Sequence, residues 1–310
     1  MKKKCILFGG GGFIGKNLAF ALNDQGYDVT IYDVYVRKAF SEDEIKEFKI
    51  IEKNYFDDNE LEKSIAGNDV IIHLISSVNP AKSMIEPSKC YSNDLIKTIE
   101  LLDAAKENNI SKVVFISSGG TVYGNYEAES YSEDMPNNPI NHYGIMKLSI
   151  EKIMLMYNSL YNMNNVILRV SNPYGRGQNP KNKLGAISVF TQEILDGNTI
   201  HIYGDGETVR DYIYIDDVIG AIEKAINYKV TSQITPVFNV GSGIGTTLNQ
   251  LLKYISSILN KEYTVEYVHS RGIDVHRSVL NIDKSKKELG MDIKHDVKEG
   301  IASYIRSISL

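Results

Sequence analysis

The stretch KCILFGGGGFIG, residues 4–15, decides how this chain folds. Residues 4–8 are apolar after the lysine and predict a buried strand, and an amphipathic helical pattern starts at Ile14. Gly9, Gly12 and Gly15 between them have the spacing of a dinucleotide-binding turn. The first glycine allows the tight turn, the second lets the backbone approach a pyrophosphate, and the third allows the helix to pack closely on the strand. The N–H groups at the start of that helix would bind the phosphates.

An acidic residue indicates which dinucleotide binds. Asp33 ends the second predicted strand, at the distance beyond Gly15 where dinucleotide-binding folds carry their ribose-binding acid. A carboxylate there accepts hydrogen bonds from the adenosine ribose hydroxyls and repels a 2′-phosphate, so the sequence predicts NAD rather than NADP. Arg37 and Lys38 are the one feature that favours NADP, and ordinary surface charges are the simpler interpretation.

Strands and helices alternate from residue 4 to residue 170, which predicts an α/β fold with a doubly wound parallel (Rossmann) sheet. After residue 170 the pattern weakens, and we expect a smaller, mixed α/β C-terminal substrate lobe. We predict an NAD-binding domain from residues 1–170 plus about 211–240, and a nucleotide-sugar-binding lobe from about 171–210 plus 241–310. The predicted strands are 4–8, 28–32, 70–74, 112–116 and 166–170, and the predicted helices are 14–25, 60–66, 93–108 and 143–160.

Composition excludes several classes of protein. The 310 residues are 43% hydrophobic with a net charge of −5, which excludes a disordered chain and gives no basic face for nucleic acid. No apolar run approaches the length of a membrane-spanning helix. Cys5 and Cys90 form neither a metal-binding pattern nor a disulfide framework. We therefore expect a cytoplasmic enzyme that binds no nucleic acid, no membrane and no metal.

Tyr143 and Lys147 lie one helical turn apart on one face of a predicted helix. A tyrosine becomes a base only if its pKa falls from about 10 towards neutrality, which requires about 4 kcal/mol of differential stabilisation. One exposed cation contributes only about 1 kcal/mol, so the pair must be desolvated or helped by a second positive charge, such as oxidised nicotinamide. The alternative is an ordinary pair on a helix surface.

With these features the sequence resembles the extended short-chain dehydrogenase/reductase superfamily, in its branch of NAD-dependent nucleotide-sugar epimerases and dehydratases. The resemblance covers almost the whole chain. Further motifs in the family's order are HLIS at 73–76, SSGGTVYG at 117–124, LRVSNPYG at 168–175, GDG at 204–206, RDYIYIDDV at 210–218, FNVG at 238–241 and RGIDV at 271–275.

The resemblance implies roles for single residues. Tyr143 would be the acid/base on the sugar hydroxyl, and Lys147 would hold the nicotinamide ribose. Arg210 and Arg271 would clamp the substrate diphosphate, because guanidinium groups bind phosphate through paired donors. A structural ion pair with Asp211 or Asp216 is the alternative for Arg210. The implied cofactor contacts are Gly9, Gly12, Phe13, Ile14, Gly15, Asp33, Leu74, Ile75, Ser76, Asn93, Ser117, Tyr143 and Lys147, and the other implied substrate contacts are Asn172, Ile202, Tyr203 and Asp274.

The sequence departs from the family pattern at two places. The family usually carries a Ser or Thr at the position of Gly119, where its hydroxyl hydrogen-bonds the reacting sugar oxygen. Ser118 is our first candidate to replace it, and Thr121 is the second. Asn54-Tyr55 stands where the family usually has Gly-Asp, so a carboxylate that would bind the adenine amine is missing there.

The loop that contains Gly119 also distinguishes the reactions of the family. Dehydratases carry Asp-Glu at the positions of Gly120 and Thr121, and decarboxylases carry Glu at the latter, so the absence of an acid favours 4-epimerisation. We expect a UDP-glucose/UDP-galactose or N-acetylhexosamine pair as the substrate, since small Ser278 matches the position beside the sugar C2. A 4-keto-sugar reductase, a dehydratase and a non-catalytic NAD-binding protein are the alternatives. The resemblance also implies a homodimer that pairs the predicted helices 93–108 and 143–160.

Overall fold

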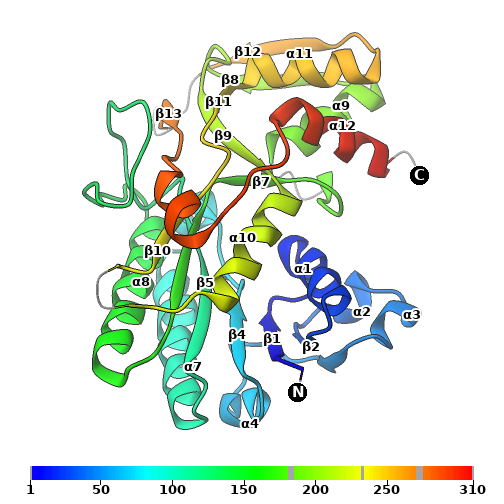
Figure 1. Ribbon diagram of the computed structural model, residues 1–310. Coiled ribbons are helices and arrows are strands. Elements are labelled where there is room, and N and C mark those ends of the chain that lie inside the picture. The colour runs from blue at the N-terminus through cyan, green and yellow to red at the C-terminus, as the bar shows by residue number, and fades with distance from the viewer. Residues whose placement is uncertain (1, 181–184, 232–233, 270–274, 309–310) are drawn as a thin grey trace.

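Seven parallel strands form the main sheet of the computed structural model, which describes residues 2–180, 185–231, 234–269 and 275–308. Their order is β10-β6-β5-β4-β1-β2-β3 (Figure 1). The order in which successive strands are added therefore reverses between β1 and β4. At such a switch point, α/β proteins bind ligands beside the carboxyl ends of the strands. The strands are β1 (Lys4–Phe8), β2 (Asp28–Tyr32), β3 (Lys49–Ile51), β4 (Val70–His73), β5 (Lys112–Ser118), β6 (Val166–Val170) and β10 (Val237–Val240).

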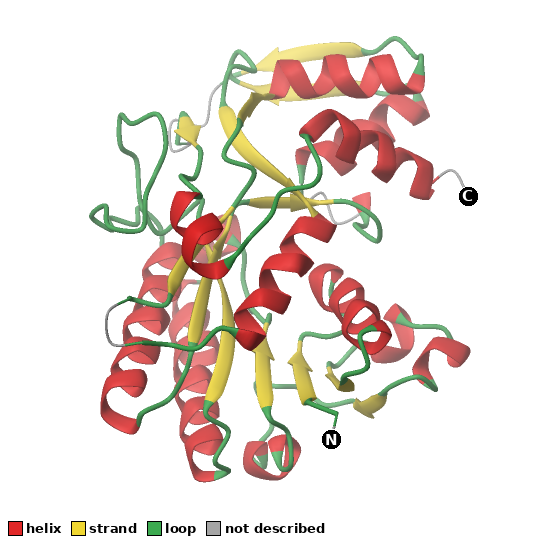
Figure 2. Cartoon of the chain, in the orientation of Figure 1, coloured by secondary structure: helices red, strands yellow, loops and turns green. Residues whose placement is uncertain are grey.

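Helices cover both faces of this sheet (Figure 2). In β1 the side chains alternate: Leu7 packs into one hydrophobic core, and Ile6 and Phe8 pack into the other. Because both faces are buried, the strands are apolar along most of their length, as is typical of parallel sheets. The first core includes α1 (Phe13–Asp24) and α10 (Ile215–Asn227), and the second includes α4 (Leu61–Ile65), α7 (Ile96–Glu107) and α8 (His142–Tyr161).

The smaller lobe lies above the carboxyl ends of the main strands (Figure 1). Its central strand is β9 (Val209–Tyr214), which pairs antiparallel with β11 (Gly245–Thr247) and parallel with β7 (Asn172–Tyr174) and β13 (Arg277–Ser278). A second parallel pair joins β8 (Thr199–Tyr203) and β12 (Thr264–Val268). The remaining elements are α2 (Val36–Ala39), α3 (Glu42–Ile45), α5 (Pro80–Ile85), α6 (Pro87–Lys89), the π-helix η1 (Cys90–Leu95), α9 (Ala186–Asp196), α11 (Leu248–Leu259), the π-helix η3 (Ser285–Leu289) and α12 (Val297–Ile308).

The predicted α/β class and every strand predicted up to residue 170 are confirmed, with bounds that differ by at most two residues. The prediction missed β3 and β10, because β3 is a three-residue strand with an exposed lysine and β10 lies in the region of weak pattern. The helix expected from residue 93 begins instead as η1 and becomes α-helical at Ile96.

No helix in the described ranges is long and apolar enough to cross a membrane. Over the same ranges, no group of three His, Cys, Asp or Glu side chains is placed to hold a metal ion.

Candidate active site

The glycine turn between β1 and α1 has the geometry of a phosphate-binding site. Gly9 has a φ of +88°, and its N–H donates to the carbonyl oxygen of Tyr32 at 2.9 Å. A β-carbon on Gly15 would lie 2.2 Å from the Gly9 oxygen, so only glycine fits there. Gly12 is the N-cap of α1 and its position carries no side-chain cap, so the first N–H groups of this helix are open to an anion.

Asp33 lies directly beside that turn. Its carboxylate accepts the N–H of Gly11 at 3.1 Å and the N–H of Tyr35 at 2.9 Å. Arg37, one of the two basic residues that favoured NADP, pairs with Glu52 at 3.1 Å. A cavity of about 830 Å³ opens beside the turn. The uncapped helix, the glycine turn without β-carbons and the Asp33 carboxylate for the ribose fit NAD there. The lining of this cavity includes Gly11, Gly12, Phe13, Lys16, Asn17, Tyr35, Lys38 and Arg176.

The segment that the resemblance predicts to lie beside the adenine has no carboxylate at position 55. Tyr55 is buried and packs edge-on against the Phe8 ring, with 5.4 Å between centroids. The exposed Asp57 accepts a hydrogen bond from the side chain of Asn54.

The segment after β4 lies against the glycine turn. A β-carbon on Gly9 would lie 3.1 Å from Ile75 Cγ1 and 3.3 Å from Leu74 Cβ. The Ser76 hydroxyl donates to the carbonyl oxygen of Val78 at 3.1 Å. The structure therefore brings Leu74 and Ile75, two of the predicted cofactor contacts, next to the glycine turn.

Tyr143 and Lys147 lie in the first two turns of α8. The Asn141 side chain caps this helix by accepting the N–H of Gly144 at 2.8 Å. Lys147 is 3% exposed, and its Nζ donates to the carbonyl oxygen of Ile116 at 3.0 Å. The same Nζ lies 5.6 Å from the centroid of the Tyr143 ring. The two side chains are thus neighbours in a buried setting, not a surface pair.

The chain alone does not activate this tyrosine. Burial raises the pKa of Tyr143 above its usual value, and the charge of Asp94 raises it further. Burial also lowers the pKa of Lys147 to about 8, which weakens the help that the lysine gives at higher pH. Burial therefore does not favour the phenolate, and help from a second positive charge, the other alternative that the sequence offers, stays a prediction.

Two hydroxyls stand near the position of the missing Ser or Thr. Ser118 ends β5 and is partly exposed. Thr121 Oγ1 is buried and has no hydrogen-bond partner among the described residues. A buried hydroxyl without a partner is costly, so Thr121 has an unused donor for a bound ligand.

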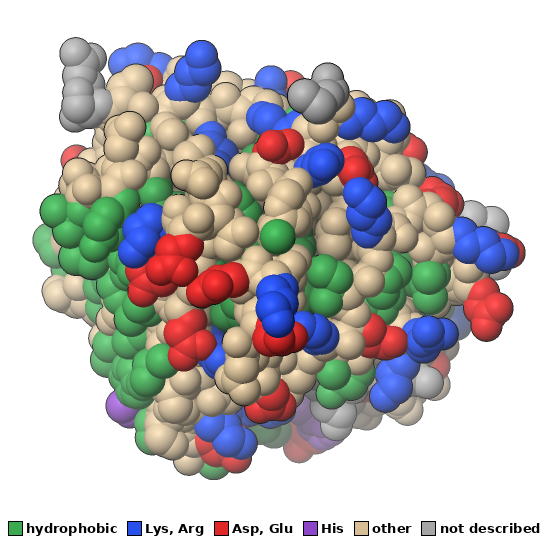
Figure 3. All heavy atoms as spheres, turned by 90° about the horizontal axis from the view of Figure 1, so that it is seen from below, with side chains coloured by type: hydrophobic (Ala, Val, Ile, Leu, Met, Phe, Trp, Pro, Cys, Tyr) green, Lys and Arg blue, Asp and Glu red, His purple; other side chains and the backbone are tan. Residues whose placement is uncertain are grey.

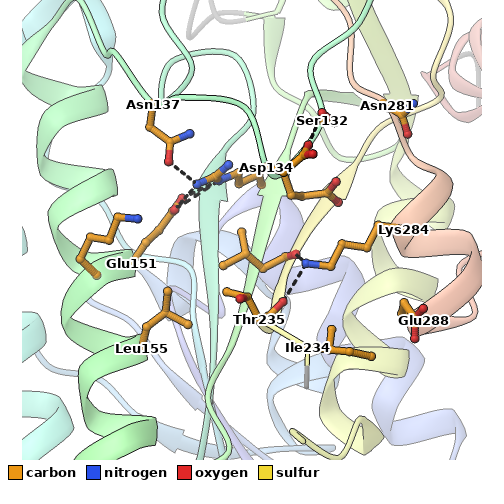
Figure 4. Close-up of a pocket in the computed structure, with 14 residues that line it drawn as sticks. Ser132, Asp134, Asn137, Glu151, Leu155, Ile234, Thr235, Asn281, Lys284 and Glu288 are labelled. Carbon is orange, nitrogen blue, oxygen red and sulfur yellow. Dashed lines mark hydrogen bonds and ion pairs between the residues drawn. The ribbon is translucent and has the colours of Figure 1, made fainter. Parts of the chain in front are cut away.

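Ser117 and Asn93 are placed differently from the other predicted cofactor contacts. The Ser117 hydroxyl donates to Glu151 at 2.5 Å, and Glu151 forms a buried ion pair with Arg169 at 2.7 Å. Glu151 and Asn137, which Figure 4 labels, line a separate cavity of about 640 Å³. Arg169 also lines this cavity and donates to Asn137 Oδ1 at 3.2 Å. Asn93 lies on η1, where its side chain accepts from Ser92. Ser117 could reach a cofactor only by its backbone atoms or after a side-chain rotation.

His73 is packed at the end of β4. Its Nε2 lies 3.0 Å from Thr98 Oγ1, and burial lowers its pKa to about 3, so the ring is neutral.

The predicted substrate contacts gather in a pocket of about 370 Å³ in the smaller lobe. Asn172 donates to the carbonyl oxygen of Asp211 at 2.8 Å, and Arg210 Nη1 donates to that of Val209 at 2.9 Å. Arg271 and Asp274 lie outside the described residues. The described lining includes Asn172, Tyr174, Ala186, Phe190, His201, Ile202, Tyr203, Thr208, Arg210, Tyr212 and Leu248.

The two aspartates offered as alternative partners of Arg210 have partners of their own. Asp211 accepts the N–H groups of Ser242 and Gly243, and Asp216 pairs with Arg176 at 2.6 Å.

A model of the NAD dependent epimerase/dehydratase family matches residues 5–241. A UDP-glucose 4-epimerase of Mycolicibacterium smegmatis is 30% identical over 97% of both chains. A dTDP-4-dehydro-6-deoxyglucose reductase of Escherichia coli is also 30% identical, over 99% of this chain and 98% of its own.

Two solved structures share the fold over nearly their whole lengths. The UDP-glucose 4-epimerase of Thermotoga maritima, solved with UDP-glucose, superposes with a TM-score of 0.92 at 31% identity, over 99% of this chain and 98% of its own. A UDP-N-acetylglucosamine 4-epimerase of Methanobrevibacter ruminantium, solved with UDP-N-acetylmuramic acid, gives 0.91 at 29% identity, over 100% and 99%.

Proposed function

The chain belongs to the NAD dependent epimerase/dehydratase family, and we propose from this premise that it interconverts UDP-sugars epimeric at C4. The observation that carries the proposal is the buried Tyr143/Lys147 pair. The pair lies at the carboxyl edge of the main sheet, which the glycine turn and the Arg210 pocket also border. The neighbouring loop supplies Gly120 and Thr121 where a dehydratase needs acids.

The chain's own residues divide the work of the reaction. NAD, when bound, supplies the acceptor and donor of the hydrogen that leaves C4 and returns to it. Tyr143 takes the proton of the C4 hydroxyl and later gives a proton back to the 4-keto oxygen. Arg210, with Arg271, holds the diphosphate while the sugar turns over and presents its other face.

A hydroxyl of the 118–121 loop positions the C4 oxygen. Ser118 and Thr121 both stay candidates, and the buried, unpartnered hydroxyl supports Thr121. The loss of the family's hydroxyl at Gly119 is then compensated two residues along the chain.

Ser278 supports a proposal that the sugar pocket leaves room beside C2 of the sugar. Ser278 on β13 lies next to Arg210 in the register of β9, and a serine there occupies little space. We propose that both UDP-glucose/UDP-galactose and the N-acetylhexosamine pair are substrates. The similarity to the UDP-N-acetylglucosamine 4-epimerase of Methanobrevibacter ruminantium supports the N-acetylhexosamine pair.

Incubation with UDP-, dTDP- and GDP-sugars without added cofactor tests this function. We expect NMR to show inversion at C4 of a UDP-hexose, with no net change in absorbance at 340 nm. Net consumption of NADH or NADPH with a 4-keto sugar would instead establish the reductase, the second candidate, which the Escherichia coli relative favours.

We also propose a homodimer built on α8 and its neighbours. Exposed apolar side chains lie on α5, α7 and α8, and Figure 3 shows hydrophobic side chains gathered on one side of the molecule. A two-fold contact would bury them. Light scattering after size exclusion tests the proposed homodimer. A cytoplasmic location stays a prediction. The exposed residues are Met84, Ile85, Ile96, Ile145, Met156 and Leu160.

A further inference from the structure

Tyr131 is a buried tyrosine in the segment between β5 and α8, where no sequence pattern marks it. It is 1% exposed, and its ring packs against the rings of Tyr123 and Tyr126, with 5.4 Å and 6.4 Å between centroids. Its hydroxyl donates to the carbonyl oxygen of Arg277 at 2.9 Å, and the carbonyl oxygen of Tyr126 lies farther away, at 3.2 Å. The buried ring therefore directs one donor at the backbone of β13.

The strand β13 lies between β9 and the loop that follows β5 (Figure 1). On one side it pairs with β9, where Ser278 is in register with Arg210. On the other side, Arg277 Nε donates to the carbonyl oxygen of Glu129 at 2.9 Å. Because β13 has only two residues, its position depends on such contacts from outside the ladder.

The position of β13 in turn determines that of Arg210. The carbonyl oxygen of His276, directly before β13, accepts the N–H of Val209 at 2.9 Å and Arg210 Nη1 at 3.5 Å. Arg210 lines the substrate pocket, and its guanidinium is the proposed clamp for the diphosphate. A shift of this backbone would therefore displace both the clamp and Ser278.

The backbone of Tyr131 holds the next part of the same segment. Its N–H donates to the carbonyl oxygen of Val279 at 2.8 Å, and its carbonyl oxygen accepts the N–H of Asn281 at 2.8 Å. Leu280, between these two, packs beside Gly119 in the loop proposed to position the C4 oxygen. A phenylalanine at residue 131 would keep these backbone contacts and lose only the hydroxyl contact to β13.

We propose that Tyr131 is a positioning residue for the nucleotide-sugar, whose hydroxyl holds β13 so that Arg210 meets the diphosphate and Ser278 meets the sugar. The inference rests on the proposed function, because it takes a UDP-sugar as the occupant of this pocket. The hydroxyl contributes to binding and does not touch the reacting atoms. Affinity for the substrate therefore depends on it, and turnover at saturation does not.

Tyr131→Phe tests this role through the separation of KM from kcat. We expect the KM for UDP-galactose and the Kd for UDP, measured by calorimetry, to rise roughly three- to tenfold, the value of one hydrogen bond. The kcat should stay at the wild-type value. The Kd for NAD should also stay unchanged, because NAD is expected at the glycine turn after β1.

Tyr157→Phe is the matched control. Tyr157 is also buried, and its hydroxyl donates to Asp103 Oδ1 at 2.9 Å, between α8 and α7. Its loss should lower the free energy of unfolding in urea at least as much as Tyr131→Phe does, and leave the KM and the Kd for UDP unchanged. Arg277→Lys keeps the charge, loses the Nε donor to Glu129 and should raise the Kd for UDP as well.

Wild-type values of the KM and of the Kd for UDP in Tyr131→Phe would overturn the proposal. A loss confined to kcat, or an equal rise of both constants in Tyr157→Phe, would overturn it too. The proposed function fails separately, if the chain binds UDP with this dependence on Tyr131 and yet inverts no sugar.

Discussion

The side chain of Leu280 fills the space beside Gly119 in which a hydroxyl-bearing side chain would otherwise stand. A β-carbon built on Gly119 would lie 2.5 Å from Leu280 Cδ1 and 3.1 Å from the carbonyl oxygen of Arg169. Leu280 is 1% exposed and cannot move out into solvent. The departure from the family pattern at residue 119 is therefore built into the packing of β5 and β6 against the chain after β13.

Gly119→Ser should destabilise the protein, because it overpacks a filled site. We expect the free energy of unfolding to fall by about 1–3 kcal/mol in urea denaturation. Gly120→Ser is the matched control, since a β-carbon there meets nothing within 4 Å, and its effect should stay within about 0.5 kcal/mol. Equal losses in the two variants would contradict the role of Leu280.

Thr121→Val tests which hydroxyl serves the sugar. The hydroxyl has no partner among the described residues, so its removal should leave stability unchanged or slightly higher. Turnover should fall roughly ten- to hundredfold, the value of a hydrogen bond to a developing charge. Ser118→Ala is measured beside it. If Ser118→Ala loses the larger share of kcat, the serine is the donor.

Gly15→Ala should abolish NAD binding, since its β-carbon would lie 2.2 Å from the Gly9 oxygen and displace the turn. Gly220→Ala on α10 is the control: nothing lies within 4 Å, and alanine favours a helix by about 0.4–1 kcal/mol. Fluorescence titration with NAD measures the affinity of both variants for the cofactor. Wild-type affinity in Gly15→Ala would mean that the cofactor binds elsewhere.

Ser278→Tyr should narrow the range of sugars. A bulky ring next to Arg210 would fill the space beside C2, so kcat/KM for UDP-N-acetylglucosamine should fall at least tenfold more than that for UDP-glucose. Both are followed by NMR on one enzyme preparation. A parallel loss for both sugars would place Ser278 away from C2.

The sequence was sufficient for five of the seven strands of the main sheet and for the glycine turn, because the patterns that predict them are local. Residues 4–15 specify strand, turn and helix through spacing alone, and the apolar runs mark strands buried on both faces. β3 was missed because a lysine followed by two isoleucines is too short a run to distinguish a strand from a loop.

The contacts that surround the reaction are not local, which is why they were missed. Asp94 meets Ser77 across 17 residues, and Gly119 meets Leu280 across a much longer span. No pattern within one element marks either pair. The resemblance directed attention to Asn93, whereas the turn of η1 carries the next residue into the interior.

The most direct test of the account is epimerisation of UDP-galactose in ²H₂O, by the wild-type chain and by Tyr143→Phe. We expect UDP-glucose that retains protium at C4, since the hydrogen returns to the carbon it left. Tyr143→Phe should be slower by about 10²–10⁴, and the exposed control Tyr161→Phe should equal the wild type. Deuterium at C4, or undiminished turnover by Tyr143→Phe, would contradict the transient oxidation of C4 with Tyr143 as its base.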